Sequence, residues 1–208
     1  MNNLILLGFY WVIWCGVHSF LITRWVNKRV HRHTGFLSAA YRLFYVFFSF
    51  VSLVPVLLYQ YSLPQVVYFE WAGPWRILQV FLLCYAGVMF YAGKQAYDIN
   101  YFLGIRQWRD YRQGRQQERA AEFKSQGILR YVRHPWYSGS LALIWALGPF
   151  SDVTLTVRII LCIYLVVGTL LEEQKLKKEI GRLYVQYCEQ VPMLIPWRGR
   201  VEWAGSRK

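Results

Sequence analysis

Three long apolar runs constrain this chain more than any other feature of its sequence. They extend over Leu4 to Val26, Tyr41 to Leu63 and Pro74 to Tyr97, and each exceeds the roughly 20 residues that a helix needs to cross the hydrocarbon of a bilayer. The first run is not expected to be a signal peptide, because it lacks a basic leading segment and a small-residue cleavage site. We therefore predict three permanent transmembrane helices in this half of the chain.

Two further apolar segments follow a long polar stretch. Trp136 to Phe150 is only fifteen residues long, and a Gly-Pro-Phe-Ser-Asp turn separates it from Val153 to Leu171. This pattern predicts a helical hairpin whose short first arm either crosses the bilayer at a tilt or re-enters it. The predicted fold class is therefore all-α and integral to the membrane, with about five transmembrane helices and a C-terminal helical hairpin.

The chain is expected to form one domain with two regions. Residues 1–97 are predicted to be a three-helix transmembrane region, and residues 98–208 are predicted to contain a cytoplasmic loop, the hairpin and a tail. Within the loop, Trp108 to Phe123 is rich in Arg, Gln, Glu and Ala. That composition predicts a surface helix lying against anionic headgroups.

The distribution of charge predicts the orientation. Residues 24–42, 94–135 and 172–208 contain 22 of the 24 lysines and arginines, and cytoplasmic loops of membrane proteins are enriched in these residues. We therefore expect the N-terminus outside and the C-terminus in the cytoplasm, in a bacterial inner membrane. Arg158 falls inside the fifth span near its outer end, where snorkelling to the headgroups or a functional charge would explain it.

The composition argues against nucleic acid as a partner, despite a net charge of +13. With 56% apolar and 19% aromatic residues, the natural solvent of the chain is lipid, and its basic residues lie between the apolar runs. The four cysteines have no spacing typical of a disulfide framework or a zinc site. A lipid bilayer and a lipophilic or small substrate are the predicted partners, and no metal site is expected.

The densest group of unusual residues precedes the hairpin, from Gly127 to Gly139. Pro135 is favourable at the first position of a helix and pushes His134 into an extended conformation. Arg133 and His134 are therefore expected at the membrane surface, just before a helix N-terminus that could bind an anionic group such as a carboxylate. An ordinary interfacial cap with a headgroup-binding arginine would explain the same residues.

A second group of polar residues follows the hairpin. Glu172 and Glu173 are adjacent carboxylates at the end of a span, and no basic residue occurs in the preceding thirteen positions. Such carboxylates need a compensating cation. Lys175 or Lys177 could provide it, and so could the sulfonium and amino group of a bound ligand.

These two groups resemble the signature of isoprenylcysteine carboxyl methyltransferases and their bacterial relatives. The family's Arg-His-Pro-x-Tyr-x-Gly motif is similar to residues 133–139, and its C-terminal signature is similar to Glu172-Glu173, Gly181-x-x-Tyr184-x-x-Tyr187 and the closing Val-Pro-x-Leu-Ile-Pro at 191–196. The resemblance covers roughly residues 98–197. It implies a membrane methyltransferase whose hairpin and tail enclose S-adenosylmethionine on the cytoplasmic side. The residues it implies for binding this cofactor are Gly127, Leu129, Tyr131, Arg133, His134, Pro135, Tyr137, Gly139, Glu172 and Glu173.

The N-terminal half resembles a narrower set of proteins. Three segments, which begin at His18, Tyr41 and Phe102, are similar to bacterial methanethiol S-methyltransferases, to the NnrU family and to zeta-carotene isomerases. Arg106, His18 and Arg42 are the predicted catalytic residues, because they could lower the pKa of a thiol or bind a carboxylate. Snorkelling of the two arginines and hydrogen-bonded packing of the histidine are the structural alternatives.

The predicted function is methyl transfer to a thiol or carboxylate of a small or lipophilic acceptor. The alternative is a haem-binding protein with His18 and His134 as ligands, because the carotene isomerases use the histidine of a His-Ser pair to bind haem. The sequence contains such a pair at His18-Ser19.

Overall fold

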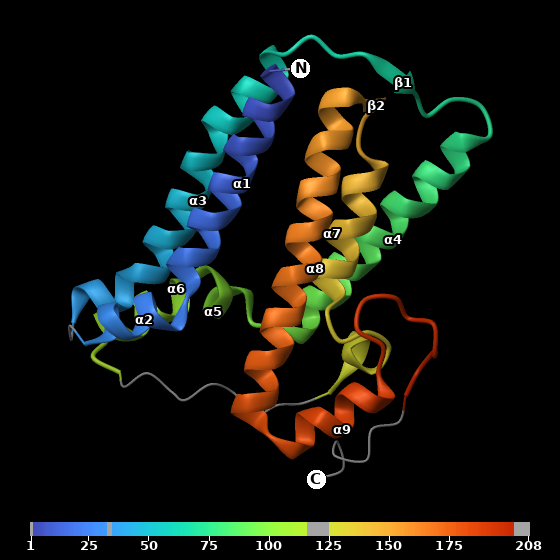
Figure 1. Cartoon of the computed structure of the whole chain (residues 1–208). Coiled ribbons are helices and arrows are strands. Elements are labelled where there is room, and N and C mark those ends of the chain that lie inside the picture. The colour runs from blue at the N-terminus through green and yellow to red at the C-terminus, as the bar shows by residue number, and fades with distance from the viewer. Residues whose placement is uncertain (1, 33–34, 116–124, 202–208) are drawn as a thin grey trace. The chain divides into compact units, whose positions relative to one another are not determined.

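The computed structural model of the chain describes residues 2–32, 35–115 and 125–201. Four helices in this part of the chain are long and apolar enough to cross a membrane. The predicted all-α membrane fold class is thereby confirmed (Figure 1). The four are α1 (Asn2–Ile22), α3 (Phe36–Ser62), α4 (Trp75–Ala96) and α8 (Asp152–Ile180).

Shorter elements connect and follow these helices. They are α2 (Arg24–His31), β1 (Val67–Phe69), α5 (Ile99–Leu103), α6 (Ile105–Arg112), the 3₁₀ helix η1 (Gly127–Arg130), α7 (Pro135–Ala146), β2 (Phe150–Ser151) and α9 (Arg182–Gln190). The predicted surface helix over Trp108 to Phe123 overlaps α6, which ends at Arg112 just before Gly114 adopts a left-handed conformation at φ 63°. Residues 116–123 of that prediction lie outside the described residues.

The chain divides into two compact units. The first contains Met1–Val66, Asp98–Ala121 and Ser151–Ile160, and the second contains Val67–Tyr97, Glu122–Phe150 and Leu161–Lys208. The chain therefore passes between the units several times. The predicted division at residue 97 stays a prediction about which residues form the catalytic core.

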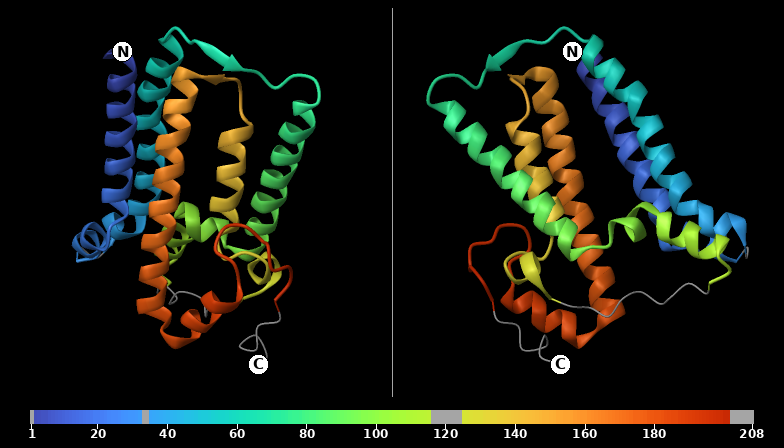
Figure 2. Two further views of the ribbon diagram at one scale, coloured as in Figure 1. Left: turned by 45° about the vertical axis from the view of Figure 1, so that its right-hand side comes forward. Right: turned by 180° about the vertical axis from the view of Figure 1, so that it is seen from behind.

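In the first unit, α1 and α3 lie side by side (Figures 1 and 2). The Trp11 indole donates to Gln60, the Trp14 indole donates to Ser52, and the Tyr41 hydroxyl donates to the carbonyl of Leu21 at 2.6 Å. Residue numbers rise along α1 as they fall along α3, so the two helices are antiparallel. Hydrogen bonds of this kind stabilise helix pairs inside lipid, where water offers no competing partner.

In the second unit, α4 packs closely against α7 because glycines remove side chains at their crossing. A Cβ added at Gly139 would lie 3.0 Å from Cβ of Met89 and 3.2 Å from the carbonyl oxygen of Ala86. The Tyr85 hydroxyl and the Ser138 hydroxyl are 2.6 Å apart across the same contact. Small residues that let backbones approach, together with interhelical hydrogen bonds, are typical of packing in membranes.

The first arm of the hairpin is shorter than the predicted segment Trp136 to Phe150. Helix α7 has twelve residues and ends at Ala146, because Leu147 is extended and Gly148 is left-handed at φ 65° before a proline. Helix α7 alone is about 18 Å long. His134, which caps α7, contacts Glu173, and Glu173 lies about 32 Å along α8 from Asp152. The segment from His134 to Asp152 must cover the same distance of about 32 Å. This favours an arm that crosses the bilayer over one that re-enters it.

Candidate functional site

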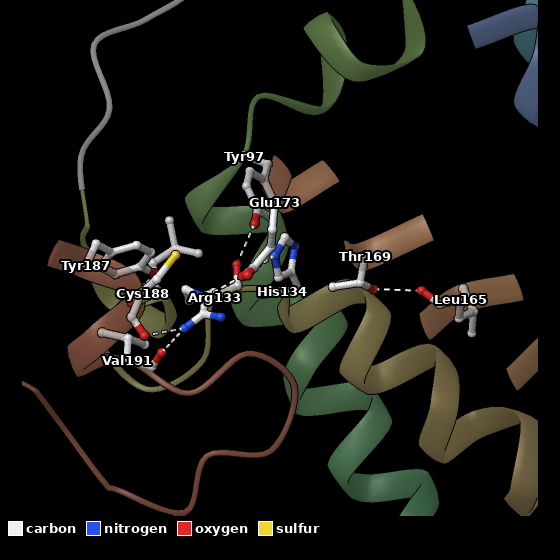
Figure 3. Close-up of polar contacts among 10 residues, drawn as sticks. Tyr97, Arg133, His134, Leu165, Thr169, Glu173, Tyr187, Cys188 and Val191 are labelled. Carbon is white, nitrogen blue, oxygen red and sulfur yellow. Dashed lines mark hydrogen bonds and ion pairs between the residues drawn. The ribbon is translucent and has the colours of Figure 1, made fainter. Parts of the chain in front are cut away.

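Arg133, His134 and Glu173 form a buried ionic cluster where the start of α7 meets the C-terminal part of α8. The Arg133 Nε donates to Oε1 of Glu173 at 2.5 Å, and Nε2 of His134 lies 3.2 Å from the same oxygen (Figure 3). The three residues are only 9%, 3% and 5% exposed in the order Arg133, His134, Glu173. Breaking such a buried pair by removing one partner is costly, because the remaining charge is left uncompensated. Glu173 therefore has its cation within the chain, and it comes from Arg133 rather than from Lys175 or Lys177.

Local sequence places each member of the cluster. Pro135 occupies the first turn of α7, as the sequence predicts. His134 caps this helix with φ −124° and ψ 70°, so its backbone is not in the extended conformation that the sequence predicts. Glu173 lies on α8, so the arginine and its carboxylate come from the two arms of the hairpin. The carbonyl of Arg133 accepts a hydrogen bond from the hydroxyl of Tyr97 at the end of α4.

Arg133 also holds the tail that follows α9. Its terminal nitrogen Nη1 donates to the carbonyl of Cys188 at 2.8 Å and to the carbonyl of Val191. The backbone N–H groups of Arg133 and His134 donate to the carbonyls of Pro192 and Met193. The two motif groups and the closing Val-Pro segment, which are far apart in the sequence, therefore meet at one arginine.

A second arginine completes the capping of α9. Arg198 donates to the carbonyls of Glu189 and Gln190 at 2.5 and 3.3 Å. Arg133 donates to the carbonyls of Cys188 and Val191. All four carbonyls of residues 188–191 therefore accept hydrogen bonds from guanidinium groups. Such carbonyls lack helical partners and carry the negative end of the helix dipole, so cations stabilise them.

The two tyrosines of the Gly181-x-x-Tyr184-x-x-Tyr187 pattern are packing residues of this cluster. Both are buried and contact each other on one face of α9 together with Val191. The Tyr187 hydroxyl donates to the carbonyl of Leu129 at 2.6 Å. Burial raises the pKa of Tyr184 and Tyr187 well above the ordinary tyrosine value. Tyr187 therefore holds the turn η1, and neither tyrosine titrates near neutral pH.

The remaining residues predicted to bind the cofactor differ in their exposure and in the contacts they already make. Tyr131 is 37% exposed, and the Tyr137 hydroxyl interacts with the half-buried carboxylate of Glu172. Gly127 is exposed at the start of η1. The structure gives Gly139 a packing role against α4, and a contact of this glycine with cofactor stays a prediction.

The three predicted catalytic residues all lie in the first unit. Arg42 donates from Nε to the carbonyl of Phe102 at 2.6 Å, and its guanidinium lies over the rings of Tyr101 and Phe102. Arg106 forms an ion pair with Asp98 at 3.1 Å. The Tyr101 N–H and the Arg106 side chain lower the pKa of the Asp98 carboxyl by stabilising its charged form.

His18 lies in a polar cluster between α1 and α3 that its sequence segment did not reveal. Its ring nitrogens contact the hydroxyls of Tyr45 and Ser49, and Trp14 stacks on the imidazole with ring centroids 5.1 Å apart. Tyr45 lies in the segment that begins at Tyr41, and helix spacing alone could not show that it faces His18. Among the described residues, no group of three or more His, Cys, Asp or Glu side chains could hold a metal ion.

Comparisons with known proteins give a consistent picture. A family model described as NnrU protein matches residues 5–179. Methanethiol S-methyltransferase 1 of Bradyrhizobium diazoefficiens is 30% identical over 86% of this chain and 59% of its own length, and the methanethiol S-methyltransferase of Mycobacterium tuberculosis is 27% identical over 95% and 78%. The methanethiol S-methyltransferase of Crocosphaera subtropica is 28% identical over 86% of this chain and 66% of its own length. The chain thus spans less than two thirds of the Bradyrhizobium protein. No solved structure matches the chain.

Proposed function

Because the chain belongs to the NnrU family, we propose that it is a multi-pass membrane methyltransferase that transfers a methyl group from S-adenosylmethionine to a small thiol. Relatives that align with most of the chain are named as methanethiol S-methyltransferases. The single observation that carries the proposal is the buried Arg133–Glu173 pair with His134. It joins the three parts of the methyltransferase signature in one place.

The residues around this cluster suit the donor. The half-buried carboxylate of Glu172 beside Tyr137 could bind the ammonium group of S-adenosylmethionine. The ring faces of Tyr131 and Tyr137 could contact its sulfonium. The N-terminus of α7 could bind the carboxylate of S-adenosylmethionine. When bound, S-adenosylmethionine supplies the methyl group as an electrophile. Arg133 is already committed to atoms of the chain, so we assign it to holding the tail in place.

Methyl transfer to sulfur depends mainly on alignment of the reacting atoms and on exclusion of water. A thiol must also lose its proton, because the thiolate is the reactive nucleophile. Arg42, Arg106 and His18 are the residues that we assign to the thiol. A prenylcysteine carboxylate is the less favoured acceptor, because the printed names of the relatives refer to a thiol.

We place the donor site on the cytoplasmic face of a bacterial inner membrane. The support is the charge distribution, since 22 of the 24 basic residues fall in the segments assigned to that side. An odd number of crossings with the N-terminus outside accommodates both α7 and the four long helices.

The haem-binding alternative would require a ring nitrogen of His18 or His134 to coordinate iron. Ser49 and Tyr45 contact the two ring nitrogens of His18, and Nε2 of His134 contacts Glu173. Coordination of iron through Nε2 would break the contact of His18 with Tyr45 and the contact of His134 with Glu173, and it would leave the capping of α9 by Arg133 without a role. The methyltransferase therefore explains more of the arrangement.

The donor site is tested by calorimetric titration of the purified protein with S-adenosylmethionine. Glu173→Gln should abolish measurable binding, and Glu172→Gln should do the same without touching the Arg133 ion pair. Glu179→Gln, on the exposed part of the same helix, is the control and should bind as the wild type does. Wild-type affinity in Glu172→Gln and Glu173→Gln, with both proteins folded by circular dichroism, would refute the site.

A further inference from the structure

The tail that follows α9 folds into a closed loop against the start of α7, and we call residues 191–201 the tail loop. The backbone N–H groups of Arg133 and His134 donate to the carbonyls of its second and third residues at 2.9 and 3.1 Å. Its last residue, Val201, donates to the carbonyl of Arg130 at 3.0 Å. Both ends of the tail loop are therefore fixed to one short segment that lies just before α7 (Figure 1).

This attachment brings the tail loop to the level of the membrane surface. The hairpin arm from His134 to Asp152 covers about 32 Å, and the hydrocarbon of a bilayer is about 30 Å thick, so His134 lies near the boundary between hydrocarbon and headgroups. Met193 is hydrogen-bonded to His134, and Ile195 follows within about 7 Å of chain. The N–H of Trp197 donates back to the carbonyl of Ile195 at 2.9 Å. The chain thus turns at this level instead of extending away from it.

The tip of the tail loop exposes two large apolar side chains. Ile195 is 70% exposed and Trp197 is 68% exposed. Exposure of such surface to water is unfavourable. Tryptophan is enriched where membrane and water meet, because its ring is apolar and its N–H is polar. A bilayer interface is therefore the environment that suits this tip.

Two arginines accompany these apolar side chains. The guanidinium of Arg198 lies over the ring of Trp197 at 4.5 Å, and Arg200 is exposed. The tail loop contains no acidic residue, and residues 189–208 contain four basic and two acidic residues. A net positive charge at the membrane surface attracts anionic phospholipids.

We propose that the tail loop is a membrane anchor. Ile195 and Trp197 insert into the interface of the bilayer that the hairpin crosses, and Arg198 and Arg200 bind the phosphates of anionic phospholipids. Since Arg133 holds the other end of the tail loop, the bilayer and the ionic cluster fix this part of the tail between them. The inference goes beyond the proposed function, because contact with lipid requires no methyl transfer.

The resonance of one tryptophan tests the contact with lipid. The chain contains ten tryptophans, so the protein is labelled with fluorotryptophan and placed in nanodiscs of phosphatidylcholine and phosphatidylglycerol. The fluorine resonance that is missing in Trp197→Phe belongs to Trp197, and unshifted resonances of the other tryptophans show that this variant is folded. A lipid with a spin label near its glycerol should broaden the Trp197 resonance several-fold more than a water-soluble gadolinium chelate does.

Two results of this measurement would overturn the proposal. Broadening mainly by the gadolinium chelate would place Trp197 in water. Broadening by neither agent would mean that protein covers Trp197, as a second copy of the chain would.

Hydrogen exchange tests the arginines without any methyl donor. Amides of the tail loop should exchange more slowly in nanodiscs that contain phosphatidylglycerol than in nanodiscs of phosphatidylcholine alone. Arg200→Gln should lose about fivefold of this protection, because one arginine near an anionic surface contributes about that factor. Equal exchange of the wild type in the two lipids would refute the assignment of anionic phospholipid as the partner.

Arg182→Gln is the matched control. Arg182 is an exposed arginine at the start of α9, and α8 continues from Glu173 to Ile180 before it. Because Glu173 contacts His134, these seven residues carry Arg182 about 10 Å beyond the level of His134. The difference in exchange between the two lipids should therefore stay at the wild-type value in Arg182→Gln. An equal loss in Arg182→Gln and Arg200→Gln would show only a general effect of charge and would overturn the role of Arg200.

Discussion

Replacement of Arg133 by glutamine should release the tail from the rest of the second unit. The guanidinium of Arg133 binds Glu173, the carbonyl of Cys188 and the carbonyl of Val191, and glutamine can satisfy at most a part of this set. Removal of one partner from a buried ion pair costs about 3 to 5 kcal/mol. The equilibrium for local opening of residues 182–201 should therefore rise by about 10² to 10³-fold or more.

Hydrogen exchange measured by mass spectrometry reports this opening directly. Amides of α9 and of the tail should exchange faster by that factor in Arg133→Gln, while amides in the middle of α4 should be unchanged. Arg198→Gln is the control, because Arg198 caps the same helix from an exposed position, and its effect should be about tenfold or less. Exchange in Arg133→Gln that matches the control would refute the assignment of Arg133 as the residue that holds the tail.

Two further substitutions test the packing and the electrostatics. Gly139→Ala should destabilise the protein by about 1 to 3 kcal/mol, because the new methyl group would press on Met89 and Ala86; Gly168→Ala, with nothing within 4 Å, should not, and equal melting temperatures for the two variants would contradict the close α4–α7 packing. Asp98→Ala should be less stable than the wild type at pH 7, and this difference should shrink in acid. The pKa of Asp98 is lowered in the folded protein, so the contribution of its charge is complete above the ordinary value of about 3.9 and is lost as the pH falls through the lower folded value. A difference in melting temperature that was as large below pH 2 as at pH 7 would refute this explanation.

The parts of the fold that depend on the length of the apolar segments could be predicted from the sequence. Apolar runs predicted α1, α3 and α4 to within five residues at each end, but α8 extends nine residues beyond the predicted end at Leu171. Pro135 correctly predicted where α7 begins. The early end of α7 was missed because Leu147 to Phe150 are apolar apart from the Gly-Pro pair, and a hydropathy pattern does not separate helix from extended chain.

The parts of the site that depend on contacts between distant residues could be predicted only in outline. The carboxylate at Glu173 was expected to need a cation, but the sequence offered Lys175 and Lys177 as neighbours and gave no means of choosing Arg133, forty residues away. Gly139 belonged to a cofactor motif in the sequence, and its contact with α4 depends on a helix crossing that periodicity does not specify. The facing of Tyr45 and His18 was hidden for the same reason, because it follows from the register of α1 against α3.

Methyl transfer itself is the most direct test of the central claim. The purified protein in lipid nanodiscs is incubated with S-adenosylmethionine labelled in its methyl group, and methanethiol, a prenylcysteine and a phospholipid are offered in parallel. The proposed function predicts that the label appears in dimethyl sulfide, the methylated form of methanethiol, and that Glu173→Gln transfers none. Label that appears only in the prenylcysteine or the phospholipid, or in no acceptor at all, would contradict it.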